Sequence, residues 1–278
     1  MDFRTVVDIP SPDFRIGPCE SLLFVGSCFA DAIGQRFLEE KFRAVVNPYG
    51  VMYNPASILH TAQRLVKDSA ELKSLKTAFL TLGTNHVYRL KETGEIVDNC
   101  QKRPQALFQE EALSVDECAD YLQQTIDVLH AHNPEMHIVL TVSPIRYRKY
   151  GYHGSQLSKA TLLLAVEKLL TSLLTSHFSL FTSYFPAYEI VNDELRDYRF
   201  YQADMLHPSD QAVTYIWERL TDIYLSDEAK QFLKEWAPLK AVLNHKPFNP
   251  ESEEYQALID KTMLKVSELQ KKYPNFAV

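Results

Sequence analysis

Residues 22–37 read LLFVGSCFADAIGQRF and join a short apolar run to a helical pattern through a Gly-Ser turn. The first five residues have the length and composition of a buried strand, because they are apolar and end at a glycine. Phe29, Ile33 and Phe37 then recur at helical spacing on one face. This arrangement predicts the first strand–turn–helix unit of an α/β protein, with Ser27 in the turn.

The same alternation continues along the chain. Further strands are predicted over residues 42–46, 77–82, 137–142 and 178–185, and helices over 29–39, from 55 onward, and over 116–131, 158–176 and 209–224. Buried strands that alternate with helices indicate parallel pairing with helices on both faces. The expected fold is a three-layer α/β/α sandwich with a mainly parallel five-stranded sheet. Residues 87–97 read as a hairpin outside this sheet.

A change of pattern after residue 225 divides the chain into an α/β domain over 1–225 and a helical appendix over 226–278. Apolar residues recur on one side of a last helix from Tyr255 to Leu269. A helix with such a stripe has to bury it, since packing supplies most helical stability in proteins. We therefore expect the appendix to pack on the α/β domain or on a dimer partner.

Charge and composition exclude several classes of protein. The 278 residues include 29 basic and 36 acidic side chains, a net charge of −7, which argues against binding nucleic acid. The sequence shows no signal-peptide pattern at its start and no run of about 20 apolar residues, so we expect a cytoplasmic location and no membrane contact. The four cysteines form no C-x-x-C pair, which favours reduced thiols.

Glycines and polar residues follow the first three predicted strands. Gly26, Gly50 and Gly83 each lie at or just after a strand end, although glycine is also common in ordinary turns. In an open parallel sheet, ligands bind in the crevice at the carboxyl ends of the strands. Farther on, Asp204 precedes His207 by three residues, a spacing that lets the carboxylate accept the imidazole proton and orient the ring as a base.

These motifs resemble the GSCFA family. Residues 26–30 spell GSCFA, and the stretches at 47–55, 143–146 and 204–209 also look like that family's pattern. GSCFA proteins are in turn similar to the SGNH (GDSL-like) hydrolases, esterases and lipases with a flavodoxin-like sheet. The resemblance covers about residues 20–225. It implies a nucleophilic serine, an oxyanion-binding glycine and asparagine, and a D-x-x-H near the carboxyl end.

Carried over by residue, the resemblance implies a catalytic triad of Ser27, His207 and Asp204. The oxyanion donors would be the N–H groups of Ser27 and Gly50 and the side-chain amide of Asn85. The sequence departs from the SGNH pattern in two places. After the first strand, Gly26 directly precedes Ser27. After the third strand, His86 stands where SGNH enzymes have an aspartate. The implied substrate is a small-molecule or carbohydrate acyl ester, and no metal or organic cofactor is required.

Other readings of these residues remain open. Ser27 suits a helix N-cap, a role compatible with a nucleophile, and Cys28 is expected to point into the core. Arg146 and Tyr147 follow the fourth strand and belong either to a solvated loop or to a substrate pocket for an anionic or sugar-like group. The rival function is a non-catalytic domain that keeps the fold and binds a glycan or peptide.

Overall fold

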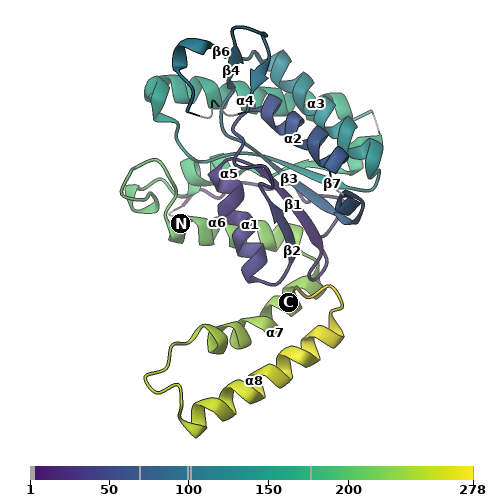
Figure 1. Ribbon diagram of the computed structural model, residues 1–278, viewed down its shortest axis with the longest axis vertical. Helices are drawn as coiled ribbons and strands as arrows, with labels where there is room; N and C mark the ends of the chain where they lie inside the picture. The colour runs from purple at the N-terminus through teal and green to yellow at the C-terminus, as the bar shows by residue number, and fades with distance from the viewer. Residues whose placement is uncertain (1–3, 69, 99, 101, 176, 278) are drawn as a thin grey trace.

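Five parallel strands form the central sheet, in the order β2-β1-β3-β7-β8 (Figure 1). The computed structural model describes residues 4–68, 70–98, 100, 102–175 and 177–277. The strands are β1 (Ser21–Gly26), β2 (Arg43–Val46), β3 (Thr77–Leu82), β7 (His137–Val142) and β8 (Thr182–Tyr184). Helices α1 (Cys28–Glu39) and α6 (Asp210–Tyr224) cover one face, and α2 (Pro55–Asp68), α3 (Val115–His132) and α4 (Gly151–Leu173) cover the other. The expected three-layer fold is confirmed.

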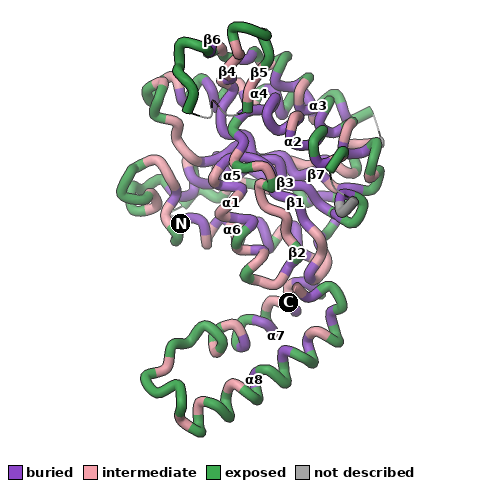
Figure 2. Tube along the Cα trace, in the orientation of Figure 1, coloured by how far each residue is buried: buried purple, intermediate pink, exposed green. Residues whose placement is uncertain are grey.

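Strand β1 shows why the apolar runs are nearly continuous. Leu22 and Phe24 belong to the apolar cluster that includes α1 and α6, whereas Leu23 and Val25 belong to the cluster on the opposite face. Successive side chains of a strand point to opposite faces, so a strand covered on both sides needs apolar residues at every position. The strands β1, β3 and β7 at the centre of the sheet are buried over almost their whole length (Figure 2).

Polar side chains cap the amino ends of α2 and α6. Asn54 caps α2 through its side-chain oxygen, which accepts a hydrogen bond from the Ser57 N–H at 2.9 Å. Ser209 caps α6 and accepts from the Ala212 N–H at 3.3 Å. These side chains satisfy N–H groups that the first turn of a helix leaves without an intrahelical partner.

Two element boundaries differ from the sequence expectation. The last strand is confined to β8, and residues 177–180 form a 3₁₀ turn instead. Phe178 stacks on the His130 ring of α3, with ring centroids 4.7 Å apart, so its apolar surface is buried outside the sheet. Helix α4 begins at Gly151, seven residues earlier than expected, and its first turns lie beside the loop that follows β7.

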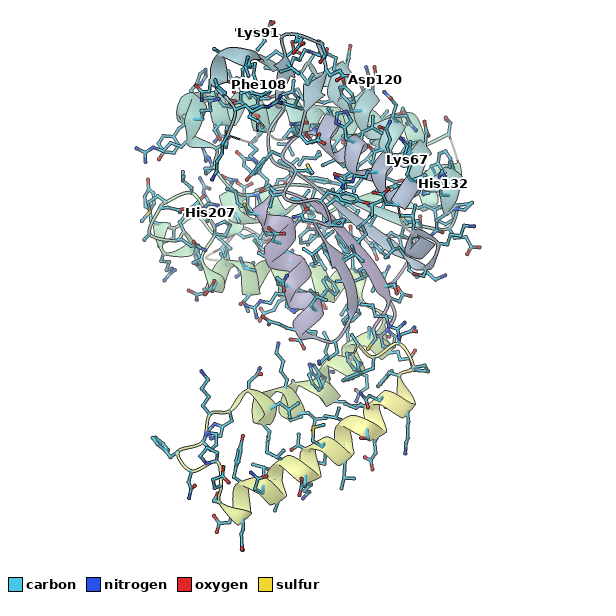
Figure 3. All side chains as sticks on the ribbon, viewed as in Figure 1. Lys67, Lys91, Phe108, Asp120, His132 and His207 are labelled. Atoms are coloured by element: carbon cyan, nitrogen blue, oxygen red, sulfur yellow. The ribbon has the colours of Figure 1, made fainter. Side chains whose placement is uncertain are left out.

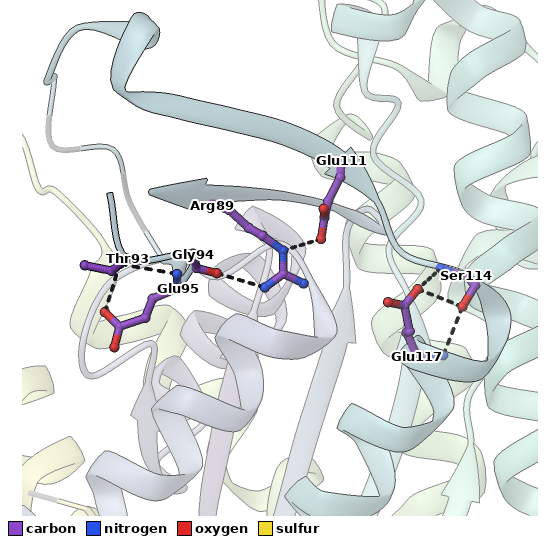
Figure 4. A network of polar contacts seen from close by, with 7 residues as sticks. All are labelled: Arg89, Thr93, Gly94, Glu95, Glu111, Ser114 and Glu117. Atoms are coloured by element: carbon purple, nitrogen blue, oxygen red, sulfur yellow. Dashed lines mark hydrogen bonds and ion pairs between the residues drawn. The ribbon is translucent and has the colours of Figure 1, made fainter. Parts of the chain in front are cut away.

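A second sheet stands above the first and includes the expected hairpin. It consists of β4 (His86–Leu90), β5 (Ile96–Val97) and β6 (Phe108–Ala112), antiparallel and in the order β5-β4-β6. Strand β6 was not expected from the sequence, because three of its five residues, Gln109, Glu110 and Glu111, are polar or charged. Arg89 joins β4 to β6 through Glu111 at 2.5 Å, and a Ser114–Glu117 capping box then begins α3 (Figure 4).

The carboxyl-terminal segment forms a helical hairpin of α7 (Asp227–Asn244) and α8 (Glu253–Lys272). Pro238 lies inside α7, and buried Trp236 and Leu239 hold this part of the helix against the domain. The hairpin projects from the sheet edge where β2 begins, and its far end is exposed (Figures 1 and 2). Among the described residues, no helix combines the length and apolarity needed to cross a membrane.

Candidate active site

Ser27 occupies the turn between β1 and α1. Its hydroxyl oxygen accepts a hydrogen bond from the Phe29 N–H at 3.3 Å, so the serine is the N-cap of α1. The residue is only 2% exposed. The carboxyl end of β1 and the amino end of α1 thus hold this hydroxyl where a helix stabilises negative charge.

Gly26 makes the turn before Ser27 sterically feasible. Its φ angle is +145°, and a Cβ atom there would lie 2.1 Å from the carbonyl oxygen of Thr81 on β3. Asn47, which follows β2, accepts the Gly26 N–H at 2.8 Å and donates to the Asp31 carboxylate at 2.6 Å. The loop after β2 therefore fastens both the turn and the first helical turn of α1.

His207 and Asp204 meet in the loop before α6, where Figure 3 labels His207. The His207 Nδ1 atom lies 2.6 Å from the Asp204 Oδ2 atom, while Asp204 Oδ1 accepts the N–H groups of Leu206 and His207 at 2.9 and 3.0 Å. The backbone N–H of His207, that of Leu206 and the imidazole lower the pKa of Asp204 to about 2. Asp204 is therefore a carboxylate at neutral pH, and it fixes the imidazole with Nε2 available as a base.

Ser27 and His207 line the same cavity, which has a volume of about 320 Å³. We call it the serine cavity. Its wall includes Ser27, Cys28, Tyr53, Arg146, Tyr147 and His207. The two residues that the sequence reading assigned to a substrate pocket, Arg146 and Tyr147, thus lie at the same cavity as the proposed nucleophile and base.

The oxyanion donors implied by the resemblance are placed differently from that expectation. The Ser27 N–H donates to the Thr81 oxygen at 3.3 Å, and the Gly50 N–H donates to the Asn47 oxygen at 2.8 Å. The Asn85 side-chain amide donates to the Leu113 oxygen at 2.7 Å. Gly50 lines a separate cavity, and Asn85 is buried at the junction with α3. The structure therefore brings only Ser27 of this set to His207.

Cys28 faces the serine cavity rather than the core. It is half-buried, and its Sγ atom lies 3.9 Å from the Tyr53 hydroxyl. Burial and the neighbouring Cys28 thiol raise the pKa of Tyr53 to about 12, so the hydroxyl stays protonated at neutral pH. The sequence reading did not single out Tyr53, although its place in the loop after the second strand, close to Gly50, was a usable signal.

The loop that carries Arg146 and Tyr147 is held by the second sheet. Lys149 makes an ion pair with Glu110 of β6 at 2.7 Å, and the Tyr150 ring stacks on His86 of β4 with centroids 3.7 Å apart. These contacts cross from β4 and β6 to the loop after β7. The small antiparallel sheet therefore fixes one wall of the serine cavity.

Helix α4 supports the part of the cavity wall formed by Gly83 and Thr84, and a buried lysine takes part in this support. The ammonium group of Lys159 donates to the Gly83 oxygen at 2.6 Å, and Ser158 Oγ lies 3.0 Å from the Thr84 hydroxyl. Lys159 is only 1% exposed. Burial, together with the positive charge of Arg146, lowers the pKa of Lys159 to about 7.

This lowered pKa predicts a pH-dependent stability. A lysine in the unfolded chain titrates near 10.4, so between about pH 7 and 10 the unfolded chain binds more protons and the free energy of unfolding rises with pH. In Lys159→Met this contribution is absent. We expect the difference in unfolding free energy between wild type and variant to change by about 2 kcal/mol from pH 7 to pH 9, in favour of wild type.

Urea unfolding of both proteins at pH 7, 8 and 9 measures this change. The lost hydrogen bond to Gly83 changes the stability of the variant by a similar amount at each pH. The slope of the unfolding free energy against pH is therefore the informative quantity. Parallel pH curves for the two proteins would contradict the assignment of a depressed pKa.

Comparison with known proteins places these features in a family. A model of the GSCFA family matches residues 21–74 and 63–220, and a model of the GSCFA domain protein, C-terminal domain, matches residues 236–278. No curated protein matches the chain.

Solved structures with a similar course of the chain include esterases. A carbohydrate esterase family 3 protein from Talaromyces cellulolyticus is 10% identical, with a TM-score of 0.43 over 78% of this chain and 99% of that one. An acetyl esterase mutant with acetate ion is also 10% identical, with a TM-score of 0.45 and the same coverage of 78% and 99%. A protein from Streptococcus pneumonia named as a platelet activating factor is 16% identical, with a TM-score of 0.48 over 74% of this chain and 84% of that one. The family models cover most of the sequence, and the chain belongs to the GSCFA family.

Proposed function

We propose that this protein is a serine ester hydrolase that uses Ser27, His207 and Asp204. The observation that carries the proposal is that Ser27 and His207 line one cavity while Asp204 holds the imidazole at 2.6 Å. A nucleophile, a base and an orienting carboxylate are the groups that acyl transfer requires.

In the proposed reaction, Ser27 Oγ attacks the ester carbonyl and His207 Nε2 takes the serine proton. The tetrahedral intermediate collapses when the C–O bond to the alcohol breaks and His207 returns the proton to the departing oxygen. Water then attacks the acyl-serine with His207 again as base, which releases the acid and restores Ser27. Each step balances without a metal or an organic cofactor.

The negative charge of the intermediate would develop beside the amino end of α1. The first-turn N–H groups of this 12-residue helix lie next to Ser27, and the helix dipole favours an anion there. The Phe29 and Ala30 N–H groups already donate to Ser27 oxygens, so the dipole of α1 as a whole takes the place of Gly50 and Asn85 as the expected source of stabilisation. The cavity of about 320 Å³ suits a small acyl group, and a carbohydrate is the proposed alcohol.

A fluorophosphonate probe tests the proposal directly, because it reacts with serines activated by a neighbouring base. We expect covalent labelling of the whole chain at Ser27, located by peptide mapping, and loss of labelling in His207→Ala. Labelling at Cys28 would show that the nucleophile is misassigned. Absence of labelling in protein with a cooperative thermal transition would contradict hydrolysis.

The second candidate is binding of a glycan or peptide without catalysis. It is favoured by one observation: the N–H or amide groups of Ser27, Gly50 and Asn85 all donate to other protein oxygens. In that case the folded protein would bind a carbohydrate or peptide at the serine cavity and fail to react with the probe.

A further inference from the structure

A second cavity of about 490 Å³ adjoins the serine cavity. We call it the adjoining cavity. Arg146 lines both. The turn before α6 also separates them, because Met205 lines the adjoining cavity and His207 lines the serine cavity. The backbone N–H of Arg146 donates to the Leu206 carbonyl oxygen at 3.1 Å. This hydrogen bond joins the loop after β7 to the turn before α6, the two segments that separate the cavities.

The partition places the adjoining cavity next to the bond that would be broken. In an ester whose carbonyl lies between Ser27 and His207, the acyl part and the alcohol part extend from the carbonyl carbon in different directions. The serine cavity has room for a small acyl group, and the alcohol part can pass Arg146 into the adjoining cavity.

Two guanidinium groups give the adjoining cavity a positive character. Arg146 and Arg196 both line it, and within the described part of the chain neither makes an ion pair with a carboxylate. The Arg146 Nε atom is buried without a hydrogen-bond partner among the described residues. A charged donor in this state stabilises an arriving anion more than a solvated one does.

The carboxylate that lies nearest in sequence does not cancel this charge. Asp197 also lines the cavity, but its Oδ1 atom accepts the Arg199 N–H at 2.9 Å and its Oδ2 atom lies 3.8 Å from Arg199 Nε. Asp197 is thus paired within its own turn. Local positive charge of this kind stands out in a chain whose net charge is −7.

Tyrosine rings supply the rest of the wall. Tyr152, Tyr198 and Tyr201 line the adjoining cavity, and the Arg146 guanidinium lies 5.8 Å from the centre of the Tyr152 ring. Tyr152 and Tyr198 are exposed. Such rings present flat apolar faces with a polar hydroxyl at the end, which suits the C–H faces and hydroxyl groups of a sugar.

We propose that the adjoining cavity binds an anionic sugar as the alcohol part of the substrate, with Arg146 and Arg196 contacting its carboxylate or phosphate oxygens. The aromatic walls contact the sugar ring. The assignment of this sugar as a leaving alcohol rests on the proposed ester hydrolysis, whereas the binding of the sugar itself does not.

Binding measured without turnover tests the proposal. Calorimetry at low ionic strength would compare glucuronate, glucose 6-phosphate and neutral glucose on the whole chain. We expect at least one anionic sugar to bind about tenfold more tightly than glucose, because a hydrogen bond to a charged group contributes about that factor or more. A preference for glucuronate identifies a carboxylate ligand, and one for glucose 6-phosphate a phosphate ligand.

Matched variants locate the site. Arg196→Gln and Arg146→Gln are each expected to weaken binding of the preferred anionic sugar about tenfold. Arg64→Gln is the control, because Arg64 is exposed, pairs with Asp68 on α2 and does not line the adjoining cavity. Arg196 is itself exposed, so its replacement leaves the core unchanged even if Arg146→Gln disturbs the partition.

Equal affinity for glucose and both anionic sugars would overturn the proposal, and so would an equal loss in Arg64→Gln and Arg196→Gln. Hydrolysis of acetylated glucuronate and acetylated glucose separates this result from the proposed function. Selective binding without hydrolysis of either ester leaves the anionic site in place and refutes the esterase. Hydrolysis of both esters at equal kcat/KM, with no selective binding, refutes the anionic site alone.

Discussion

Ser27→Ala is expected to lower kcat for a short-chain nitrophenyl ester by at least about 10³-fold, since loss of the nucleophile removes the acyl-enzyme pathway altogether. Ser27 also caps α1, and the loss of a cap costs about 0.5–2 kcal/mol of stability. The variant should therefore remain folded. Steady-state kinetics and a thermal melt on the same preparation measure both effects.

Cys28→Ala is the matched control for this substitution. Cys28 is the next residue and lines the same cavity, but its Sγ atom lies 3.9 Å from the Tyr53 hydroxyl, and no hydrogen bond joins it to Asp204 or His207 among the described residues. We expect Cys28→Ala to keep kcat within about tenfold of wild type, a small loss beside that of a missing nucleophile. Full activity in Ser27→Ala together with inactive Cys28→Ala would transfer the nucleophile to the thiol.

Truncation after Ser226 is expected to lower the melting temperature by more than about 5 °C or to make the protein insoluble. The hairpin of α7 and α8 covers Phe42, whose ring lies 6.1 Å from that of Phe232, and the Trp236 indole donates to the Glu39 oxygen at 3.2 Å. Burial of one such aromatic side chain contributes about 1.5–3 kcal/mol. A change of 1 kcal/mol shifts the melting temperature by about 2–4 °C in a chain of this size.

Two substitutions in the whole chain test whether the contacts of the hairpin with the domain, and not merely its presence, stabilise the protein. Trp236→Ala should cost about 3–5 kcal/mol because Trp236 is buried against the domain. Phe248→Ser lies at the fully exposed end of the hairpin and should leave the melting temperature unchanged within about 1 °C. If the truncated protein and Trp236→Ala both melt like wild type, the hairpin does not stabilise the domain.

The arrangement of the sheet, and the position of Ser27 and His207 at one edge of it, could be predicted from the sequence. Apolar runs that end at glycines identify the carboxyl ends of parallel strands, and such ends lie at one edge of the sheet. The pairing of Asp204 with His207 could be predicted because both residues lie in one turn. These features depend on local pattern and on a general rule of topology.

Other features depend on partners far away in the sequence. The Asn85 amide is occupied by Leu113, 28 residues later, and no local signal reports that contact. Strand β6 is held by pairing with β4 in spite of its charged residues. Cys28 faces the cavity because consecutive residues at a helix start point about 100° apart, so one position decides between core and cavity. Arg196 reads as an ordinary surface charge until its neighbours are known.

The contacts between residues 41–43 and residues 275–277 also set an order of events during synthesis. The Ala277 N–H donates to the Lys41 oxygen at 3.1 Å, and Arg43 Nε donates to the Asn275 oxygen at 3.0 Å. A site made by residues 41–43 is therefore covered by residues that are translated more than 200 positions later. At about 5–20 residues per second, Phe42 waits for tens of seconds before its cover is translated. During that interval the nascent α/β domain presents an apolar patch beside the edge strand β2, a surface suited to chaperone binding.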